Sequence, residues 1–550
     1  MKAMHVLSAA EMQACDLATT ERFGVPSLLL MRAASSAVAA FACQQFPQAH
    51  RVTVLCGRGN NGGDGMMTAR LLVEAGLDVT TLLLGSPEQL KGDAAHAWRE
   101  LTSPVQGRAY VISEPQELVR RKDALDAHLI VDAVLGTGFK PPMKGMALAA
   151  LEWLRGGHTP VLAVDLPSGW PADATSATVD AQVFPADGVV TFTAPKPAHV
   201  FGQLTRRWDQ PVVVAPIGSP DAAIVSTLGI DWAGSSLELA QAPRADAANK
   251  GNFGHVLVVG GSFGTAGGKA GAPAMTALAA LRSGVGLATA AVPAPALPIV
   301  ASFVPELMTI PLAATAAGEI AAKNLEAKQL AGLTAGMTVL AIGPGMGQSA
   351  QTAKFTTELL SATQMPAVID ADALNILARR PALLAKLSRK GKRTVVLTPH
   401  PGEMARLIGA TAAEVQANRL ETARSFAQRF AVTLVLKGAR TLIAHPDGRV
   451  AVNTTGNPGM AKGGSGDLLT GLIAGLLAQY PHDAPRAVEA AVYLHGLAAD
   501  LAVRDGDEHT LLATDCLARL AQAYSSRAHR FSSGAKKGYV WLQGALRAAD

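Results

Sequence analysis

Two series of short, apolar, β-branched runs, each run followed by a segment of helical character, constrain this 550-residue chain more than any other feature. The alternation is typical of a parallel sheet with helices on its faces, because parallel strands need a crossover between them. A polar, alanine-rich passage at residues 235–252 separates the two series. The chain is therefore predicted to be an α/β protein with two sheets. The strands are expected at residues 51–57, 78–85, 129–136, 161–169, 188–194 and 211–218 in the first series, and at 255–262, 286–293, 337–345, 367–374, 393–400, 433–439 and 441–448 in the second.

The expected domain boundaries follow these two series. A first domain with a Rossmann-like, doubly wound sheet is expected over residues 1–235, a linker over 236–250 and a second α/β domain over 251–525. The final residues, 526–550, carry five basic groups and one acidic group without periodicity. That composition is typical of a flexible basic tail.

Composition limits the classes of partner and compartment. The net charge is +5, with 17% charged and 49% hydrophobic residues, which is typical of a soluble globular protein and gives no indication of nucleic-acid binding. The four cysteines lack both disulfide-framework and metal-ligand spacing. We find no targeting segment or membrane span and expect a cytoplasmic enzyme. The alanine-rich spacing at residues 28–42 indicates helix packing or subunit contact, so a homo-oligomer is expected.

A glycine-rich turn, residues 57–65, joins an apolar strand to a helix in the first domain. Backbone amides in such a turn approach an anion closely, and the helix N-terminus favours negative charge. Gly57, Gly59 and Gly62 satisfy the dinucleotide pattern GxGxxG, but the next strand ends in LLLGSP and lacks the acidic residue that holds a ribose. An ordinary redox dinucleotide site is therefore disfavoured.

Polar residues follow several other strands of this domain. Asp132, Asp165 and Ser168 lie at the ends of two predicted strands, and Lys196 lies just past another. Ligands of open parallel sheets bind beyond the carboxyl ends of the strands, so these side chains are expected to converge there. An aspartate at a strand end is often no more than a turn or helix cap, but the set together predicts a site.

The segments GNNGGDG, VDAVLGTGF, VDLPSG and TFTAPKP occur in this order, and the chain over residues 5–225 resembles the NAD(P)H-hydrate epimerase domain. The resemblance implies that Asp165 is catalytic with Lys196 nearby, and that K⁺ is held by Asn61, Asp132 and Ser168. It also implies a set of substrate-binding residues, namely Asn60, Asn61, Gly62, Gly63, Asp64, Gly136, Thr137, Gly138, Phe139, Lys140, Pro141, Pro142 and Asp165.

The segment NTTGNPGMAKGGSGDLLTG is the most informative part of the second domain. Glycines 463, 464 and 466 lead into an apolar helix, so free amides and the helix dipole would meet a phosphate there. Asp467 beside them could accept a hydroxyl proton while the amides stabilise a transferred phosphoryl group. The alternative is an N-cap aspartate with glycines that serve tight helix packing.

Together with KGNFGHVLVVGGS, GPGMG, DADALN and TPHPGE, this segment resembles the ribokinase-like ADP/ATP-dependent NAD(P)H-hydrate dehydratase family over residues 245–525. The resemblance implies Asp467 as catalytic base, Mg²⁺ and ADP as cofactors, and NADHX and NADPHX, the hydrates of NADH and NADPH, as substrates. It implies substrate contacts from Gly268, Gly347, His400 and Asp467. It implies nucleotide contacts from Lys437, Gly438, Ala439, Arg440, Thr441 and Gly466.

The two resemblances predict joint chemistry. Hydroxide at C6 of the hydrated nicotinamide is a poor leaving group, and phosphorylation makes it a good one. Because a dehydratase specific for the S-epimer would leave the R-epimer unused, an epimerase on the same chain removes that limit. Two alternatives stay open: a ribokinase-fold kinase of a vitamin-precursor alcohol with a non-catalytic first domain, and a binding or scaffold role for the first domain alone.

Overall fold

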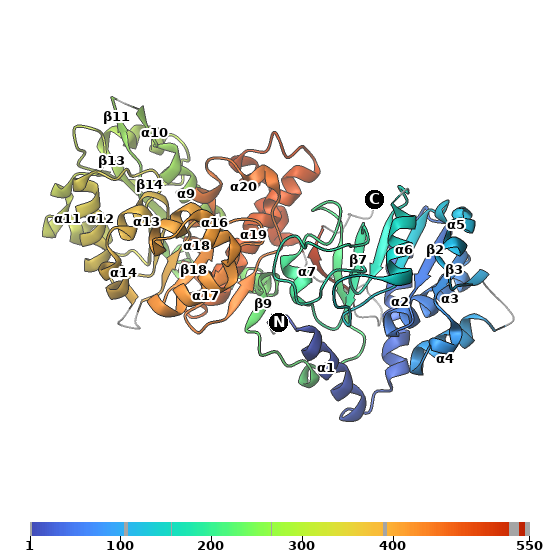
Figure 1. Ribbon diagram of the computed structural model, residues 1–550. Coiled ribbons are helices and arrows are strands. Elements are labelled where there is room, and N and C mark those ends of the chain that lie inside the picture. The colour runs from blue at the N-terminus through green and yellow to red at the C-terminus, as the bar shows by residue number, and fades with distance from the viewer. Residues whose placement is uncertain are drawn as a thin grey trace. The chain divides into compact units, whose positions relative to one another are not determined.

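The two predicted series of strands form two separate α/β sheets in the computed structural model of the protein (Figure 1). The chain divides into an N-terminal unit, residues 4–229 with 527–550, and a C-terminal unit, residues 230–526 with the first three residues. The predicted α/β class is therefore confirmed for both halves. The structure describes residues 3–103, 108–155, 157–265, 267–388, 393–526 and 538–544.

The N-terminal sheet has the strand order β21-β8-β7-β6-β5-β2-β3-β4, and its strands run parallel except for β21. The chain order reverses between β2 and β5, which opens a crevice at the carboxyl ends of these strands. Every residue of β5 and β7 is buried, as in strands covered on both faces. The strands are β2 (Arg51–Cys56), β3 (Asp78–Leu84), β4 (Arg108–Ile112), β5 (Leu129–Ala133), β6 (Val161–Val164), β7 (Gly188–Phe192), β8 (Val212–Ala215) and β21 (Val540–Gln543).

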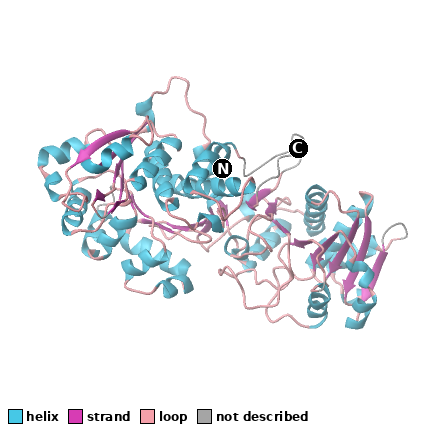
Figure 2. Cartoon of the chain, turned by 90° about the horizontal axis from the view of Figure 1, so that it is seen from above, coloured by secondary structure: helices cyan, strands magenta, loops and turns pink. Residues whose placement is uncertain are grey.

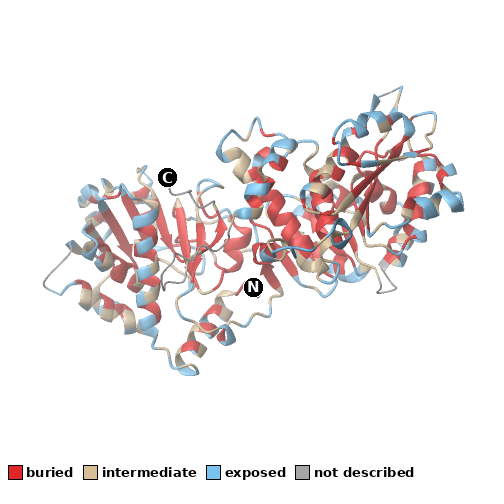
Figure 3. Ribbon diagram, turned by 180° about the vertical axis from the view of Figure 1, so that it is seen from behind, coloured by how far each residue is buried: buried red, intermediate tan, exposed pale blue. Residues whose placement is uncertain are grey.

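Two hydrophobic clusters cover the two faces of this sheet (Figure 3). Val54 and Leu55 are neighbours on β2 and point to opposite faces. Val54 belongs to the cluster that contains Val38 and Met66, and Leu55 belongs to the cluster that contains Leu151. The first face is covered by α2 (Ser27–Gln45), α3 (Asn60–Glu74) and α4 (Gly92–Leu101), and the second by α5 (Pro115–Arg120) and α6 (Gly145–Leu154).

Helix α2 is the one helix in the described part of the chain with the length and hydropathy of a membrane span. Its residues Val38 and Phe41 are fully buried in the first cluster. A core helix of a globular domain passes the same test of length and hydropathy. The packing of α2 fits that explanation.

The end of the chain returns to the N-terminal sheet. Strand β21 pairs antiparallel with β8, and Trp541 packs against Phe41 with ring centroids 5.9 Å apart. The Tyr539 hydroxyl donates to the Ala37 carbonyl at 2.6 Å. The prediction of a flexible tail is therefore wrong for residues 538–544, while 527–537 and 545–550 lie outside the described residues. The run is four residues long and its partner is remote in sequence, so periodicity gave no signal.

In the C-terminal unit the strand order is β9-β20-β19-β18-β17-β16-β15-β10-β13-β14. The strands from β14 to β18 run parallel, and antiparallel pairs follow at β18–β19 and β19–β20. The strands are β9 (Ile230–Trp232), β10 (His255–Val259), β13 (Leu287–Pro293), β14 (Met308–Leu312), β15 (Val339–Ile342), β16 (Ala367–Ile369), β17 (Val395–Leu397), β18 (Thr433–Leu436), β19 (Leu442–Ala444) and β20 (Val450–Val452).

Helices flank the strands of each unit in the view of Figure 2. In the C-terminal unit α9 (Gly271–Arg282) and α18 (Ser465–Gln479) pack together against the central strands. Two glycines further along α18, outside the predicted phosphate turn, allow this close helix packing. A Cβ at Gly471 would lie 2.1 Å from the Thr276 carbonyl oxygen, and one at Gly475 would lie 1.9 Å from the Ser283 hydroxyl. Further helices are α12 (Ala350–Ala362), α13 (Ala371–Ala378), α15 (Pro401–Ile408), α17 (Arg419–Phe430), α19 (Ala484–Arg504) and α20 (Ala513–Ser525).

The boundary between the units falls earlier than the sequence predicts. The C-terminal unit begins at Ile230, and β9 pairs parallel with β20 in its sheet. Trp232 is fully buried and donates from Nε1 to the Thr454 hydroxyl at 2.9 Å. The expected linker, 236–250, opens with the buried Ser236 and with α8 (Leu237–Ala240), so its first residues belong to the packed unit.

Candidate active sites

The glycine-rich turn brings the ends of β2 and β5 into direct contact. A Cβ at Gly57 would lie 2.0 Å from the Val134 carbonyl oxygen, and one at Gly62 would lie 1.9 Å from the Gly57 carbonyl oxygen. Helix α3 begins at Asn60 without a side-chain cap. Because the first amides of a helix lack intrahelical partners, this turn offers N–H donors at the carboxyl edge of the sheet.

Asp132 and Ser168 form a buried pair at this edge. Both side chains are fully buried, and Asp132 accepts from the Ser168 amide at 2.8 Å and from the Ser168 hydroxyl at 2.6 Å. Burial raises the pKa of Asp132 to about 6, although the Ser168 hydrogen bonds oppose the rise. An uncompensated carboxylate at this depth is costly, so the pair favours an additional positive partner.

The side chain of Asn61 lacks partners within the described residues. Its Oδ1 and Nδ2 atoms are both buried and unbonded. A Cβ at Gly136 would lie 3.2 Å from the Asn61 Cβ, so this amide lies against the loop that follows β5 and Asp132. An orphaned amide oxygen, a carboxylate and a hydroxyl are hard oxygen donors. The residues predicted as K⁺ ligands therefore fit such an ion chemically.

Asp165 and Lys196 form a second buried pair, between the ends of β6 and β7. The Lys196 Nζ lies 2.8 Å from Asp165 Oδ1 and 2.8 Å from the Thr191 hydroxyl, which itself donates to Asp165 at 2.7 Å. Asp165 has a φ of 67°, a left-handed conformation that is costly outside glycine. Backbone strain at a buried ion pair points to a functional site.

The protonation states at this pair follow from its neighbours. Burial alone would raise the pKa of Asp165, but the charge of Lys196 and the hydrogen bonds from Lys196 and Thr191 outweigh it and the pKa is lowered. Burial and Lys196 lower the pKa of His199 to about 4. The Lys196 amide donates to His199 Nδ1, so Nε2 carries the proton and donates to the Asp165 carbonyl at 2.7 Å. At neutral pH the site contains ionised Asp165 and neutral His199.

Asp16, which the sequence analysis did not select, belongs to the same cluster. Burial, with Asp165 nearby and Lys196 opposing, raises the pKa of Asp16 to about 6, and its Oδ1 is buried without a partner in the described structure. Burial, Asp165 and Asp16 together raise the pKa of Asp64 well above its usual range. Helix α1 (Ala9–Glu21) places Asp16 one turn after the buried Met12, and that spacing is the signal that could have found it.

The predicted substrate residues from Gly136 to Pro142 form a loop that is largely open to solvent. The loop from Gly136 to Pro142 follows β5, and its residues Gly138, Lys140, Pro141 and Pro142 are exposed. The Phe139 amide donates to the Gly136 carbonyl at 3.0 Å, which closes a turn. The structure therefore brings this loop, the glycine-rich turn and the Asp165–Lys196 pair to one edge of the sheet.

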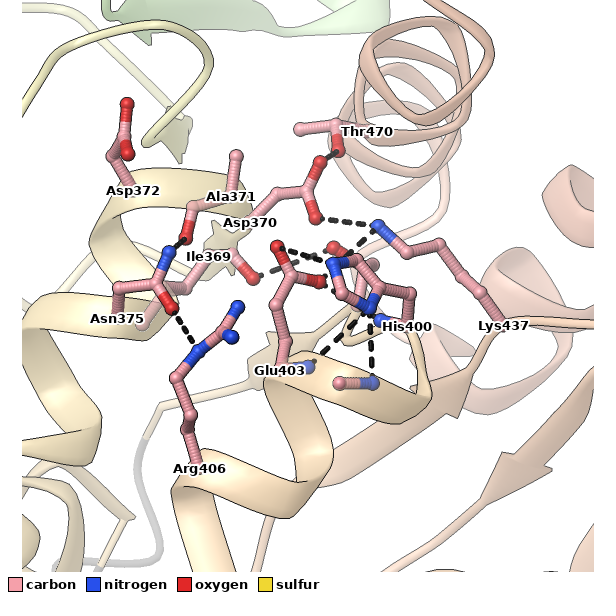
Figure 4. Close-up of polar contacts among 12 residues, drawn as sticks. Ile369, Asp370, Ala371, Asp372, Asn375, His400, Glu403, Arg406, Lys437 and Thr470 are labelled. Atoms are coloured by element: carbon pink, nitrogen blue, oxygen red, sulfur yellow. Dashed lines mark hydrogen bonds and ion pairs between the residues drawn. The ribbon is translucent and has the colours of Figure 1, made fainter. Parts of the chain in front are cut away.

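The C-terminal unit has its own lysine–aspartate pair at the ends of β16 and β18, in which Asp370 is buried and Lys437 is partly exposed (Figure 4). The Lys437 Nζ lies 2.9 Å from Asp370 Oδ1, and the Thr470 hydroxyl donates to Asp370 Oδ2 at 2.9 Å. Burial lowers the pKa of Lys437, but Asp370 and Glu403 outweigh it, so the pKa lies above its usual value. Lys437 is therefore cationic at the start of α18.

Asp467 stands beside this pair in the first turn of α18. The N-cap is Gly464, with a φ of 93°, so Asp467 is not the capping residue of the alternative interpretation. A Cβ at Gly466 would lie 3.4 Å from Lys437 Nζ, which shows how closely this turn approaches the cation. Burial and Asp370, against Lys437, raise the pKa of Asp467 to about 6. A carboxylate with this pKa suits a general base near neutral pH.

Asp372 holds the loop after β15. The Gly347 amide donates to Asp372 Oδ2 at 3.0 Å and the Gln348 side chain to Oδ1 at 2.8 Å. Lys269 Nζ lies 3.9 Å from the same carboxylate. Lys269 follows the short hairpin β11 (Phe263–Gly264) and β12 (Gly267–Gly268), which contains the predicted Gly268. Gly347 therefore contacts Asp372 directly, whereas Gly268 only precedes Lys269 in the chain.

His400 has a structural role and an open side. Its Nδ1 accepts from the amides of Gly402 at 3.0 Å and Glu403 at 3.3 Å, which caps α15. Nε2 lies 3.6 Å from Glu403 Oε1, and Lys437 lies 3.7 Å from Glu403 Oε2. Burial lowers the pKa of His400 although Glu403 opposes it. His400 therefore caps a helix, and its half-exposed ring lies beside the Lys437 pair, while its predicted substrate contact stays a prediction.

The predicted nucleotide turn after β18 divides into two parts. The guanidinium of Arg440 points inward, where its Nη1 donates to the Thr454 carbonyl at 3.0 Å and burial lowers its pKa to about 10. The Thr441 hydroxyl donates to the Gly438 carbonyl at 2.9 Å. Gly438 and Ala439 are exposed at the tip. The structure thus leaves the backbone of this turn open, with the Arg440 side chain directed away.

Two glycine-lined helix starts beside buried carboxylate–lysine pairs define a class of protein: a two-domain α/β enzyme of phosphate-bearing ligands. Comparison with known proteins narrows this class. Residues 27–198 match the family model described as YjeF-related protein N-terminus, and residues 256–521 match the model described as NAD(P)H-hydrate dehydratase.

Curated relatives match almost the whole chain. A bifunctional NAD(P)H-hydrate repair enzyme of Moorella thermoacetica is 40% identical, covering 94% of this chain and 95% of that protein. The enzyme of the same name from Escherichia coli K12 is 34% identical over 86% of this chain and 85% of its own. The chain belongs to the family of bifunctional NAD(P)H-hydrate repair enzymes.

Among solved structures, the ADP/ATP-dependent NAD(P)H-hydrate dehydratase of Bacillus subtilis, co-crystallised with ATP and Mg²⁺, is 33% identical. It covers 52% of this chain and 96% of its own, with a TM-score of 0.44.

Proposed function

We infer that this chain repairs hydrated nicotinamide dinucleotides with two separate sites. The N-terminal unit interconverts the R- and S-epimers of NADHX and NADPHX, and the C-terminal unit dehydrates the S-epimer. The strongest support is that this chain, a member of the repair-enzyme family, has a carboxylate–lysine cluster at the carboxyl edge of each of its two sheets.

Asp165 is the proposed proton carrier of the epimerase. Inversion at C6 breaks the C–O bond as the ring nitrogen donates its electron pair, and the departing hydroxide takes a proton from solvent and leaves as water. Water then adds from the opposite face and releases one proton, which returns to solvent between turnovers, so that the protons balance. The ionised Asp165 accepts the proton that the adding water releases, and Lys196 holds that carboxylate ionised between proton transfers. The amides of the glycine-rich turn and the loop from Gly136 to Pro142 bind the dinucleotide.

The proposed K⁺ ligands are Asn61, Asp132 and Ser168. A bound monovalent cation would supply positive charge that attracts the oxygen atoms of the substrate. The residues themselves support it through the orphaned Asn61 amide and the buried Asp132 carboxylate. Replacing K⁺ in the buffer by tetramethylammonium, an ion too large for the site, is expected to lower epimerase activity and leave dehydration of the S-epimer unchanged. Equal epimerase rates in both salts would contradict the assignment.

Asp467 is the proposed base of the dehydratase. It accepts the proton of the C6 hydroxyl while that oxygen attacks the terminal phosphate of ADP, which releases AMP. The ring nitrogen then expels phosphate from C6, and loss of the C5 proton restores the C5=C6 bond. The α18 amides and Lys437 lie where they stabilise the transferred phosphoryl group. A Mg²⁺ ion, when bound, would neutralise charge on the phosphates of ADP, and the carboxylates that would hold it are Asp370 and Asp372, which lie close enough to Asp467 to affect its pKa.

The nucleotide assignment is tested by product analysis. The protein is incubated with an R,S mixture of NADHX and either ADP or ATP, and restored NADH absorbance, AMP and phosphate are measured. We expect full recovery of both epimers with ADP and equal amounts of AMP, phosphate and NADH. A stable phosphoester without NADH would instead support the alternative, a kinase of an alcohol substrate. We also propose that the protein forms a homo-oligomer in the cytoplasm and that residues Lys437–Thr441 contact the nucleotide.

A further inference from the structure

Arg58 is an exposed cation at the carboxyl edge of the N-terminal sheet, and the proposed proton chemistry does not use it. It follows Gly57 in the glycine-rich turn, and its Nη1 donates to Gln89 Oε1 at 3.0 Å. Within the described part of the chain Arg58 forms no ion pair with a carboxylate. A single neutral partner leaves its charge available to a ligand.

Glycine at the end of β3 makes room for this side chain. A Cβ at Gly85 would lie 2.7 Å from the Arg58 Cδ and 3.0 Å from its Cγ, and Gly85 has a φ of 140°. Strands β2 and β3 run parallel in register, with Cys56 opposite Leu83. Arg58 therefore lies across the end of β3, at the position where redox dinucleotide folds place an acidic residue for the ribose 2′-hydroxyl.

The strand order fixes which end of a dinucleotide reaches this position. Asp132, Asp165 and Lys196 follow β5, β6 and β7, on one side of β2, whereas β3 lies on the other side. A substrate with its nicotinamide at Asp165 and its pyrophosphate on the glycine-rich turn extends its adenosine toward β3. The ribose that carries the extra phosphate of NADPHX then lies beside Arg58.

We propose that Arg58 binds the adenosine 2′-phosphate of NADPHX and makes the epimerase site selective between its two substrates. This rests on the proposed epimerase function and adds the residue that distinguishes the phosphorylated from the unphosphorylated dinucleotide. A guanidinium matches a phosphate with two parallel hydrogen bonds. Glu88, which precedes the Arg58 partner Gln89 in the turn after β3, accepts from the Ser86 hydroxyl.

The test measures epimer exchange in the full chain without added nucleotide, so that dehydration does not contribute. Starting from one pure epimer, the rate of appearance of the other is followed by chromatography for NADHX and for NADPHX, and the spontaneous rate is subtracted. Arg58→Ala is expected to lower kcat/KM for NADPHX by about 10- to 100-fold, the range for a lost hydrogen bond to a charged group, and to change that for NADHX by less than about twofold.

Two further variants and an inhibitor pair sharpen the result. Arg58→Lys should retain part of the NADPHX activity, and Arg51→Ala, which removes the same charge from the opposite end of β2, should affect neither substrate. Inhibition of the exchange by NADP⁺ should weaken in Arg58→Ala while inhibition by NAD⁺ stays unchanged. An equal loss for both substrates, or no loss for either, would overturn the proposal. No exchange by the unaltered protein would refute the epimerase function itself.

Discussion

Each of the two sites contains a lysine–aspartate pair with a buried carboxylate, but the proposed reactive carboxylate has a different position relative to that pair. In the N-terminal unit Asp165 is itself the partner of Lys196, and its pKa is lowered. In the C-terminal unit Asp370 is the partner of Lys437, and Asp467 stands outside the pair with its pKa raised to about 6. Asp165 and Asp467 are both largely buried but have opposite pKa shifts, so burial alone does not decide the charge. Direct contact with the cation does.

The comparison predicts that each carboxylate can be removed without disabling the other site. Asp467→Asn should lower S-NADHX dehydration by about a thousandfold, within the range for a lost general base, and leave epimer exchange unchanged. The measurements are NADH recovery with ADP and epimer exchange without it. Asp447→Asn, on the exposed turn after β19, is the control and should retain both activities. Residual dehydration near the unaltered rate would remove Asp467 from the mechanism.

The lysines should differ in how much stability they contribute. Lys196→Met leaves Asp165 buried without its cation, which should cost about 3–5 kcal/mol of unfolding free energy. Lys437→Met should cost less, because the Lys437 side chain is partly exposed whereas that of Lys196 is fully buried.

Denaturant unfolding of both variants, with Asp165→Asn/Lys196→Met as a third, measures the difference. The double variant should recover part of the loss without recovering activity. Equal losses of unfolding free energy in the two lysine variants would contradict the predicted difference between the two pairs.

The N-terminal unit should also depend on the end of the chain. Trp541 is buried against Phe41, so Trp541→Ala should cost about 3 kcal/mol or more through the cavity that it leaves. Thermal unfolding of the N-terminal unit, followed through loss of epimer exchange, reports the change. Val119→Ala, at an exposed apolar position of the same unit, is the control. An unchanged midpoint for Trp541→Ala would show that β21 contributes nothing to the fold.

The smallest expected effect is the pH dependence of stability at Asp467. Its folded pKa of about 6 lies above the ordinary value of 3.8, so the ionised form costs folding free energy that grows as the pH rises from 3.8 to 6. Asp467→Asn should therefore stabilise the C-terminal unit by on the order of 1–3 kcal/mol at pH 7 and by nothing below pH 4.

For the unaltered enzyme, protonation of Asp467 should lower dehydration about tenfold for each pH unit below 6. Asp165 has the opposite shift: its stabilisation is present above pH 3.8 and is lost as the pH falls through its lowered pKa. Denaturant unfolding and initial dehydration rates across this range measure both effects. A dehydration rate that stays flat through pH 6 would contradict the raised pKa.

Sequence reasoning missed two kinds of strand: partly exposed strands at sheet edges, and the short, fully buried strands β9, β20 and β21, which are only three or four residues long. Every predicted strand is present, and β5, β7 and β15 have all of their residues buried. The missed strands β4 and β14 lie at sheet edges, where part of each strand is exposed and the apolar run is broken. Strand β21 was missed because its partner β8 is more than 300 residues away in the sequence. Edge pairing is set by tertiary contacts, which local patterns do not report.

The site residues show a similar division. Motifs with glycine turns located Asp165, Lys196 and Asp467 at the sheet edges where the structure has them. Asp16 and Asp370 were not selected as site residues, because what distinguishes each is a lysine that the fold brings close from a distant strand. The inward orientation of the Arg440 side chain was also not predictable from the sequence, because its partner Thr454 belongs to the segment after β20.

The most direct test of two separable sites compares the two epimers in Asp165→Asn. Recovery of NADH with ADP is measured from pure S-NADHX and from pure R-NADHX. We expect an unchanged rate of NADH recovery from the S-epimer, and a rate from the R-epimer that falls to that of spontaneous epimerisation. An unchanged R rate, or an equal loss from both epimers, would contradict the claim that each unit works through its own carboxylate.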